Sequence, residues 1–227
     1  MLTADGRTQP SLNPTVGRPR TQLARPVKSY NVTVQQTDMP PEKLQHIWVV
    51  TGPAGCGKTT VAKGLQEKLG LPFLEGDDYH PPANREKMAN GIPLTDADRW
   101  DWLISLREAA ILPLSATDEC PTPPSGVIVT CSALKRKYRD VMRVAAYGHP
   151  SVRIHFIYLR ADENVLMDRV TKRKDHYMKS GMVHSQIELL EEPVNEWDAV
   201  AVDVAAPPEE VANRVITAVH ATMAEYQ

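Results

Sequence analysis

A short run in the first third of the chain has the composition of a loop that binds a triphosphate. Residues 52–59 read GPAGCGKT and fit the pattern GxxxxGK followed by Ser or Thr, with an apolar run before them and a helical pattern after them. Glycines let backbone N–H groups turn toward one anion, and a following helix directs the positive end of its dipole there. Lys58 would bridge the β and γ oxygens, and Thr59 would offer its hydroxyl to Mg²⁺. The predicted nucleotide-binding residues are Gly52, Gly55, Cys56, Gly57, Lys58, Thr59 and Thr60, with Lys58 also assigned to catalysis and Thr59 to the metal.

Charged and polar residues also gather after the next apolar run. Directly after residues 72–75 come Asp77, Asp78 and His80. In parallel α/β sheets ligands bind beyond the carboxyl ends of the strands, so Asp77 should face the phosphate loop. A carboxylate within reach of an attacking hydroxyl can accept its proton during phosphoryl transfer to an alcohol. The sequence therefore predicts Asp77 as the general base and Asp78 as a solvated neighbour.

The elements that must position these residues follow an alternating pattern. From His46 onward, short apolar runs alternate with helical stretches, which is typical of a parallel sheet covered by helices. Several runs lack polar alternation, as strands buried on both faces do. We therefore predict a three-layer α/β/α fold with a central parallel sheet of about five strands and a helical lid. The strands are expected at residues 47–51, 72–75, 127–131, 152–159 and 199–204.

Glycine and proline mark where the helices begin and end. A helix over residues 60–69 should stop before Gly70, and the last helix should begin at Pro208, after which valines recur at intervals of four residues. Four prolines between residues 112 and 126 indicate a surface loop before the third strand. The backbone of residues 203–208, between the last strand and the last helix, could line an adenine pocket.

The segment 168–176 reads DRVTKRKDH and is dense in positive charge. Lys and Arg favour helix C-termini, so a solvated helix end is one interpretation. Arg169 and Arg173 would share a helix face, and this spacing resembles the entry to the lid of nucleoside-monophosphate kinases. That resemblance implies that Arg169 contacts adenine and that Arg173 stabilises charge in the transition state. A lid that closes over the phosphates would exclude water during transfer.

The chain after the second predicted strand resembles the acceptor segment of short P-loop gluconokinases, which reads GDxxHPxxNxxKMxxGxPLxDxDRxPWL. Asp101 departs from this pattern, because the family has proline there, and the departure affects the local turn rather than the chemistry. Further matches at residues 131–140 and 176–193 extend the resemblance over about residues 47–210. The matching residues of the segment are Gly76, Asp77, His80, Pro81, Asn84, Lys87, Met88, Gly91, Pro93, Leu94, Asp96, Asp98, Arg99, Trp102 and Leu103.

The resemblance implies a P-loop kinase that uses ATP and Mg²⁺ to convert D-gluconate to 6-phosphogluconate, and family precedent favours a homodimer. Residues 46–227 would form one kinase domain with its lid at about 170–185. A polyol acid needs a cation for its carboxylate and hydrogen-bonding groups for its hydroxyls. The assignment of His176 to the substrate rests on the resemblance alone. Arg139 could pair with Asp140 or with a Glu on a helix face instead of binding substrate. The predicted substrate-binding residues are Asp77, His80, Lys87, Arg99, Ser132, Arg139 and His176.

The composition indicates which kinds of binding partner and which cellular compartment to expect. The 227 residues include 26 Lys and Arg against 28 Asp and Glu, and the formal net charge of −2 gives no bulk attraction to nucleic acid or an anionic membrane. No apolar run approaches the roughly twenty residues of a spanning helix. The three cysteines have no metal-ligand spacing, which fits a reduced, cytoplasmic compartment. Residues 1–45, rich in proline and polar residues, are predicted to be a disordered N-terminal extension.

The residues alone leave two alternative functions open. One is a P-loop kinase of another small alcohol, such as shikimate. The other is a nucleotide-binding switch protein without transfer activity, although the chain lacks a guanine-reading Asn-Lys-x-Asp run. The third predicted strand also ends Val-Thr-Cys-Ser, without the acidic residue that many P-loop ATPases place there. Metal binding would then rest on Thr59, the phosphates and water, with Asp77 in an assisting role.

Overall fold

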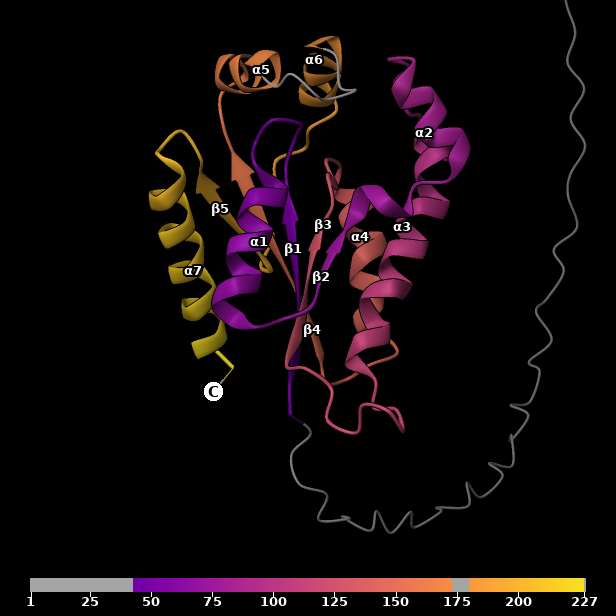
Figure 1. The fold of residues 1–227 in the computed structure, drawn as a ribbon, viewed down its shortest axis with the longest axis vertical. Helices are drawn as coiled ribbons and strands as arrows, with labels where there is room; N and C mark the ends of the chain where they lie inside the picture. The colour runs from indigo at the N-terminus through magenta and orange to yellow at the C-terminus, as the bar shows by residue number, and fades with distance from the viewer. Residues whose placement is uncertain (1–42, 173–179, 227) are drawn as a thin grey trace, which may run out of the picture. The chain divides into compact units, whose positions relative to one another are not determined.

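The computed structural model describes residues 43–172 and 180–226. In these ranges the sheet has five parallel strands in the order β2-β3-β1-β4-β5. Figure 1 shows the strands running together with their carboxyl ends toward helices α5 and α6. The parallel five-strand sheet predicted from the sequence is confirmed. The strands are β1 (Gln45–Thr51), β2 (Phe73–Glu75), β3 (Gly126–Thr130), β4 (Val152–Arg160) and β5 (Ala199–Asp203).

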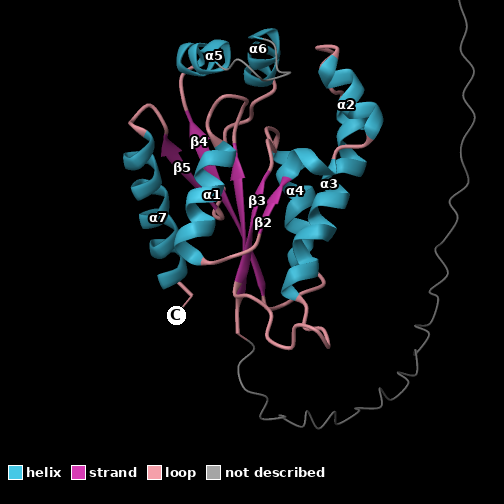
Figure 2. Cartoon of the chain, viewed as in Figure 1, coloured by secondary structure: helices cyan, strands magenta, loops and turns pink. Residues whose placement is uncertain are grey.

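Helices cover both faces of the sheet, which confirms the predicted three layers. Helices α1 (Lys58–Leu69) and α7 (Pro208–Ala224) lie on one face, and α3 (Asp96–Ile111) and α4 (Arg136–Arg143) lie on the other (Figure 2). Helices α5 (Glu163–Lys172) and α6 (Ser180–Glu188) lie beyond the carboxyl ends of the strands. The remaining helices are α2 (Pro82–Ala89) and the short 3₁₀ helices η1 (Gly76–Tyr79), η2 (Leu112–Leu114) and η3 (Val144–Ala146). None of the helices in the described ranges is long and apolar enough to cross a bilayer.

The two faces of the sheet carry separate hydrophobic clusters. Along β1, Ile47 and Val49 pack toward α3 and α4, whereas Trp48 and Val50 pack toward α1 and α7. All four side chains are buried, which explains why the run shows no polar alternation. Burying one such side chain stabilises the fold by about 1.5–3 kcal/mol. The central strands therefore hold both helical layers in place.

The strand boundaries differ from the predictions by one or two residues. Strand β1 begins at Gln45 rather than at residue 47, because Gln45 pairs with Val152 of β4. Strand β2 begins at Phe73 rather than at residue 72, since Pro72 has no N–H to donate and only its carbonyl accepts, from Ile128. The predicted N-terminal extension lies outside the described residues up to residue 42, and so do residues 173–179 of the predicted lid.

A buried histidine pair lies on the face of the sheet that α7 covers. His46 Nδ1 and His155 Nε2 are 2.9 Å apart, and His155 stacks on Trp48 with ring centroids 4.4 Å apart. Tyr226, just after α7, contacts both imidazoles edge-on. Burial lowers the pKa of both histidines, that of His155 to about 4, and the neighbouring Arg153 adds to the effect. Both imidazoles are therefore neutral at pH 7 in the folded chain.

This pair should make the fold sensitive to acid. Because the folded pKa of His155 is about 4 against an ordinary value of 6.5, the unfolded chain binds more protons between these values. We expect the free energy of unfolding to fall as the pH drops through this window, by a few kcal/mol at most. Urea denaturation across the pH range measures the loss. In His155→Gln the slope should flatten, and identical slopes in both proteins would contradict the expectation.

Candidate active site

The phosphate loop connects β1 to α1, as its sequence pattern predicts. Gly52 has φ +142° and Gly55 has φ +84°, conformations that L side chains rarely adopt. A Cβ at Gly52 would lie 2.9 Å from both Cys56 Sγ and Leu159 O. Because α1 begins at Lys58, the unpaired N–H groups of its first turn belong to this loop. The backbone can therefore surround an anion closely only with glycine at these positions.

The side chains of the loop divide into reactive and structural ones. Lys58 Nζ donates to Gly52 O at 3.0 Å and to Pro53 O at 3.1 Å. An ammonium group has three donors, so it can exchange these carbonyls for phosphate oxygens. Cys56 is buried and its thiol pKa is raised by that burial, so it is a neutral packing residue whose backbone belongs to the loop. The exposed Thr59 donates its hydroxyl to Glu75 Oε2 at 2.8 Å.

A cavity of about 320 Å³ adjoins the loop on the α7 side. Its walls are loop residues, the last turn of α5, the chain after β5 and the start of α7. Arg169, predicted near adenine, lines this cavity and donates to Val204 O at 2.6 Å. The predicted backbone segment 203–208 contributes to the same wall. The lining residues are Gly55, Cys56, Gly57, Thr60, Val61, Arg169, Lys172, Val204, Ala206, Pro208, Val211 and Ala212.

A second, smaller cavity of about 50 Å³ lies where Lys58 meets the residues after β2 and β3. We call it the acceptor cavity. It brings together five residues singled out from the sequence, namely Lys58, Asp77, His80, Arg99 and Ser132. Gly55, Cys56 and Gly57 line the larger cavity and Lys58 lines this one, so both cavities adjoin the phosphate loop. The other lining residues are Met88, Pro93, Leu94, Trp102, Ser185 and Gln186.

Gly76 fixes the turn that carries Asp77. Its N–H donates to Thr130 Oγ1 at 3.0 Å, and its carbonyl accepts from Trp102 Nε1 at 2.7 Å. A Cβ at Gly76 would lie 1.9 Å from Thr130 O, so the residue must be glycine for β2 and β3 to approach this closely. These contacts of Gly76 with β3 and α3 place the next residue, Asp77, at the cavity.

His80 is a neutral group in the acceptor cavity. Its ring stacks on Trp102 with centroids 4.1 Å apart, and only 5% of the residue is exposed. Burial lowers its pKa to about 4, although Asp77 acts in the opposite direction. At pH 7 His80 can donate or accept a hydrogen bond but contributes no charge.

Two predicted cations have different surroundings. Arg99 is buried beside the acceptor cavity, donates to Leu94 O and lies 3.4 Å from the Tyr138 hydroxyl. Lys87 does not line the cavity, because its ammonium pairs with Asp98 Oδ1 at 2.6 Å. Asp98 also closes the capping box that begins α3. Lys87 therefore joins α2 to α3, and its predicted direct contact with substrate is not supported by this geometry.

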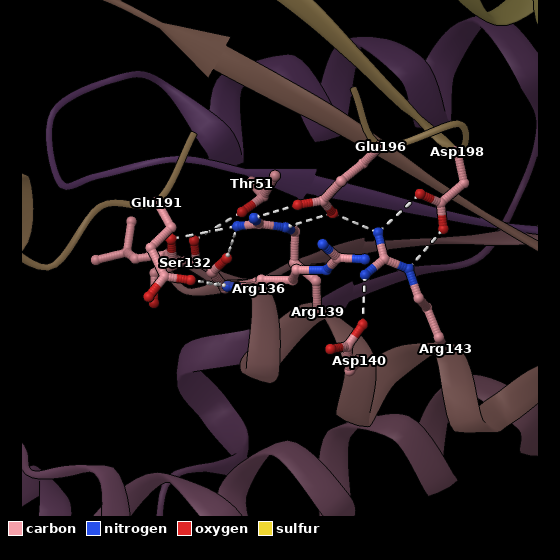
Figure 3. A network of polar contacts seen from close by, with 11 residues as sticks. Thr51, Ser132, Arg136, Arg139, Asp140, Arg143, Glu191, Glu196 and Asp198 are labelled. Carbon is pink, nitrogen blue, oxygen red and sulfur yellow. Dashed lines mark hydrogen bonds and ion pairs between the residues drawn. The ribbon is translucent and has the colours of Figure 1, made fainter. Parts of the chain in front are cut away.

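Arg139 is also placed differently from its predicted contact with substrate. Only 1% of it is exposed, and its Nε and Nη2 bind the Glu196 carboxylate at 2.9 and 2.6 Å (Figure 3). Nη1 donates to the carbonyls of Ala133 and Leu134. The guanidinium is thus directed into the protein framework rather than to the acceptor cavity. The sequence could not reveal this, because Glu196 lies 57 residues further along the chain.

Two predicted residues cannot be placed, and three important ones were missed. Arg173 and His176 lie outside the described residues. Glu75 was missed, although an acid at the carboxyl end of a parallel strand carries the same signal that identified Asp77. Gln186, whose Oε1 accepts from Ala54 N at 2.7 Å, lies in the segment 176–193 that matches the family pattern but carries no predicted role. Its neighbour Ser185 gave no signal, because it lies far along the chain from the loop.

The oxygen atoms around Thr59 suit a magnesium ion. The Thr59 hydroxyl and the Glu75 carboxylate are adjacent, and Glu75 also accepts from the Thr130 hydroxyl. Mg²⁺ prefers oxygen donors and keeps several waters and phosphate oxygens as ligands. Within the described ranges there is no group of three or more His, Cys, Asp or Glu that could hold a metal by itself. The residues present fit an ion bound mainly through the phosphates.

Comparisons with known proteins agree with this geometry. The AAA domain family matches residues 47–196. A probable gluconokinase of Schizosaccharomyces pombe is 43% identical over 190 residues, covering 83% of this chain and 95% of that protein. The thermoresistant gluconokinase of Escherichia coli K12 is 41% identical over 167 residues, covering 73% and 89% respectively. A crystal structure of a gluconokinase from Sinorhizobium meliloti 1021 has a TM-score of 0.67 and 39% identity, covering 82% of this chain and 97% of that one.

The chain covers almost the whole length of each of these relatives, and the family match over residues 47–196 includes the phosphate loop and the residues that line the acceptor cavity. The chain belongs to the gluconokinase family.

Proposed function

We propose that this chain transfers the γ-phosphoryl group of ATP to the 6-hydroxyl of D-gluconate, giving 6-phospho-D-gluconate and ADP. The observation that carries the proposal is the narrow cavity in which Lys58 of the phosphate loop meets Asp77, His80, Arg99 and Ser132. Membership of the gluconokinase family supports the choice of acceptor. The alternative acceptor, shikimate, and the switch-protein interpretation have no comparable support.

The nucleotide would occupy the loop and the larger cavity. The triphosphate would accept hydrogen bonds from the backbone of residues 55–60, and the base would lie between the Arg169 side chain and the chain after β5. Lys58 would leave the carbonyls of Gly52 and Pro53 to neutralise the β and γ oxygens. Arg173, in the predicted lid, would stabilise the equatorial oxygens of the transferred group.

Asp77 would accept the proton of the gluconate 6-hydroxyl. As the bond between that oxygen and Pγ forms, the bond between Pγ and the β–γ bridging oxygen breaks, and the negative charge leaves with ADP. Arg99 is buried and lines the acceptor cavity as Lys58 does, and it would bind the gluconate carboxylate while Lys58 binds the phosphates. Neutral His80 and the Ser132 hydroxyl would bind sugar hydroxyls, with His176 of the predicted lid as a further contact.

Thr59 and Glu75 would hold Mg²⁺ together with the β and γ phosphates. When bound, the ion neutralises phosphate charge in the transition state. Glu75 would orient water ligands of the ion, because its carboxylate already accepts from Thr59 and Thr130. Asp77 is the second acid on this edge of the sheet and could assist.

The remaining proposals concern the setting of the enzyme. We propose a cytoplasmic homodimer that acts in gluconate degradation and has no nucleic acid or membrane partner. The net charge of −2 supports the last point, and family precedent supports the dimer. Light scattering behind a sizing column tests the dimer directly.

An acceptor panel tests the function itself. Purified protein with ATP and Mg²⁺ should release ADP with D-gluconate far faster than with shikimate, glycerol or other sugar acids. The coupled ADP assay measures the rate, and mass spectrometry should find the phosphate on the 6-position. Equal turnover of shikimate would contradict the proposed acceptor, and tight GTP binding without acceptor-dependent ADP release would favour a switch protein.

Asp77→Asn should lower kcat by about a hundredfold or more, because the amide cannot accept the proton of the attacking hydroxyl. Steady-state kinetics with both substrates varied measures the change. Asp78→Asn is the matched control, since Asp78 is an exposed neighbour on the same turn. A wild-type rate in Asp77→Asn would remove Asp77 from the role of base.

Lys58→Ala should abolish turnover with the fold intact.

Glu75→Gln should raise the Mg²⁺ concentration needed for half-maximal ADP binding by about tenfold, because the amide keeps the shape of the carboxylate but loses its charge. Titration calorimetry of ADP at several Mg²⁺ concentrations measures this. Glu67→Gln, an exposed position on α1, should leave the Mg²⁺ dependence unchanged. An unchanged Mg²⁺ requirement in Glu75→Gln would argue against the proposed role.

A further inference from the structure

We infer that the buried Arg139–Glu196 ion pair is a positioning device that fixes Ser132 in the acceptor cavity. The inference rests on the proposed function, because it assumes that Ser132 contacts the acceptor. Arg139 itself does not line the cavity. It acts through the loop of residues 131–135, which leaves β3 beside the phosphate loop.

Three successive carbonyls of this loop are held from outside it. Thr51 Oγ1 donates to Ser132 O at 2.6 Å. Arg139 Nη1 donates to Ala133 O at 3.0 Å and to Leu134 O at 3.2 Å. The backbone N–H of Glu191 adds a second bond to Leu134 O at 2.8 Å. Figure 3 shows these contacts converging on the loop from β1, from α4 and from the chain that precedes β5. Arg139 is the contact that spans two of the three carbonyls.

The loop needs this support because Ala133 has φ +33°. Positive φ places the Cβ of an L-residue against its own backbone, so Ala133 adopts this conformation only when its surroundings impose it. Ala133 is 1% exposed and directly follows Ser132. Without the two bonds from Arg139, Ala133 O loses this donor and the backbone at Ala133 can relax toward negative φ, although Thr51 still holds Ser132 O. That rotation would turn the Ser132 hydroxyl away from its present direction.

Glu196 makes the guanidinium rigid enough for this role. Its side chain is 8% exposed, and it binds Arg139 in a bidentate pair. Arg143 completes the network by pairing with Glu196 and with the buried Asp198 at 2.7 Å. Breaking a pair of buried charges leaves one of them without compensation, which makes the arrangement rigid. The planar guanidinium reaches the carboxylate with one edge and the loop carbonyls with the other.

The same network also connects the two walls of the acceptor cavity. Ser132 stands on the loop after β3, whereas Ser185 and Gln186 stand on α6. The chain after α6 contributes Glu191, whose carboxylate accepts from Arg136 N at 2.8 Å, and then Glu196. The Arg139–Glu196 pair therefore sets the loop after β3 against the chain that leaves α6. A change in this pair should alter acceptor binding specifically.

Arg139→Lys tests the inference, because lysine keeps the charge but lacks the planar fork with which Arg139 binds both oxygens of Glu196 while a third nitrogen donates to the two carbonyls. We expect KM for gluconate to rise by at least about fivefold while KM for ATP stays within about twofold. In a Ser132→Ala background the same substitution should change KM for gluconate by less than about twofold, since its effect passes through Ser132. Glu196→Gln should reproduce the pattern if Arg139→Lys does not fold.

Asp140→Asn is the matched control, because Asp140 forms an exposed ion pair with Arg143 on the same helix. It should change neither KM. Thermal unfolding of each variant separates lost stability from lost positioning. Additive effects of Arg139→Lys and Ser132→Ala on KM for gluconate would overturn the inference, and so would a loss of stability with both KM values unchanged. If the wild-type protein prefers another acceptor, the proposed function fails, and the same comparison with that acceptor still decides the role of Arg139.

Discussion

The parallel register of β2, β3 and β1 is the constraint on which the site depends. Thr130, the last residue of β3, lies opposite Val50 of β1 and Glu75 of β2. The three strands therefore end at one level, and the phosphate loop, the turn with Asp77 and the loop with Ser132 leave the sheet side by side. Any slip in this register would separate the groups that must act on one phosphoryl group.

Much of this arrangement follows from local sequence. The phosphate loop and the strands have short-range signals, namely glycine spacing, apolar runs and helix stops, and the structure agrees with them within one or two residues. Asp77 could be placed because it follows a strand directly. The substrate roles of Arg139 and Lys87 stay predictions, because in the structure both cations pair with carboxylates, Glu196 and Asp98, that lie far along the chain or on another helix. Charge and loop position cannot distinguish a cation that binds a ligand from one that holds the framework.

The acceptor cavity combines the charged residues Lys58, Asp77 and Arg99 with neutral polar ones. His80 is neutral, since its pKa is about 4, and Arg99 is a buried cation beside it. A neutral imidazole can bind a hydroxyl without competing for the substrate carboxylate. Fixed groups of this kind need little reorganisation during reaction, which is where a preorganised site lowers the barrier. The ion pairs that Glu196 makes with Arg139 and Arg143 keep the loop of Ser132 rigid.

The hydrogen bond from Ala54 N to Gln186 has a thermodynamic consequence. Gln186 belongs to α6 and lines the acceptor cavity, while Ala54 belongs to the loop that would receive the triphosphate. One side chain thus contacts both substrate sites, so a ligand that shifts α6 or the loop changes the other site too. Linkage then requires reciprocity: whatever factor ATP imposes on the affinity for the acceptor, the acceptor imposes on the affinity for ATP.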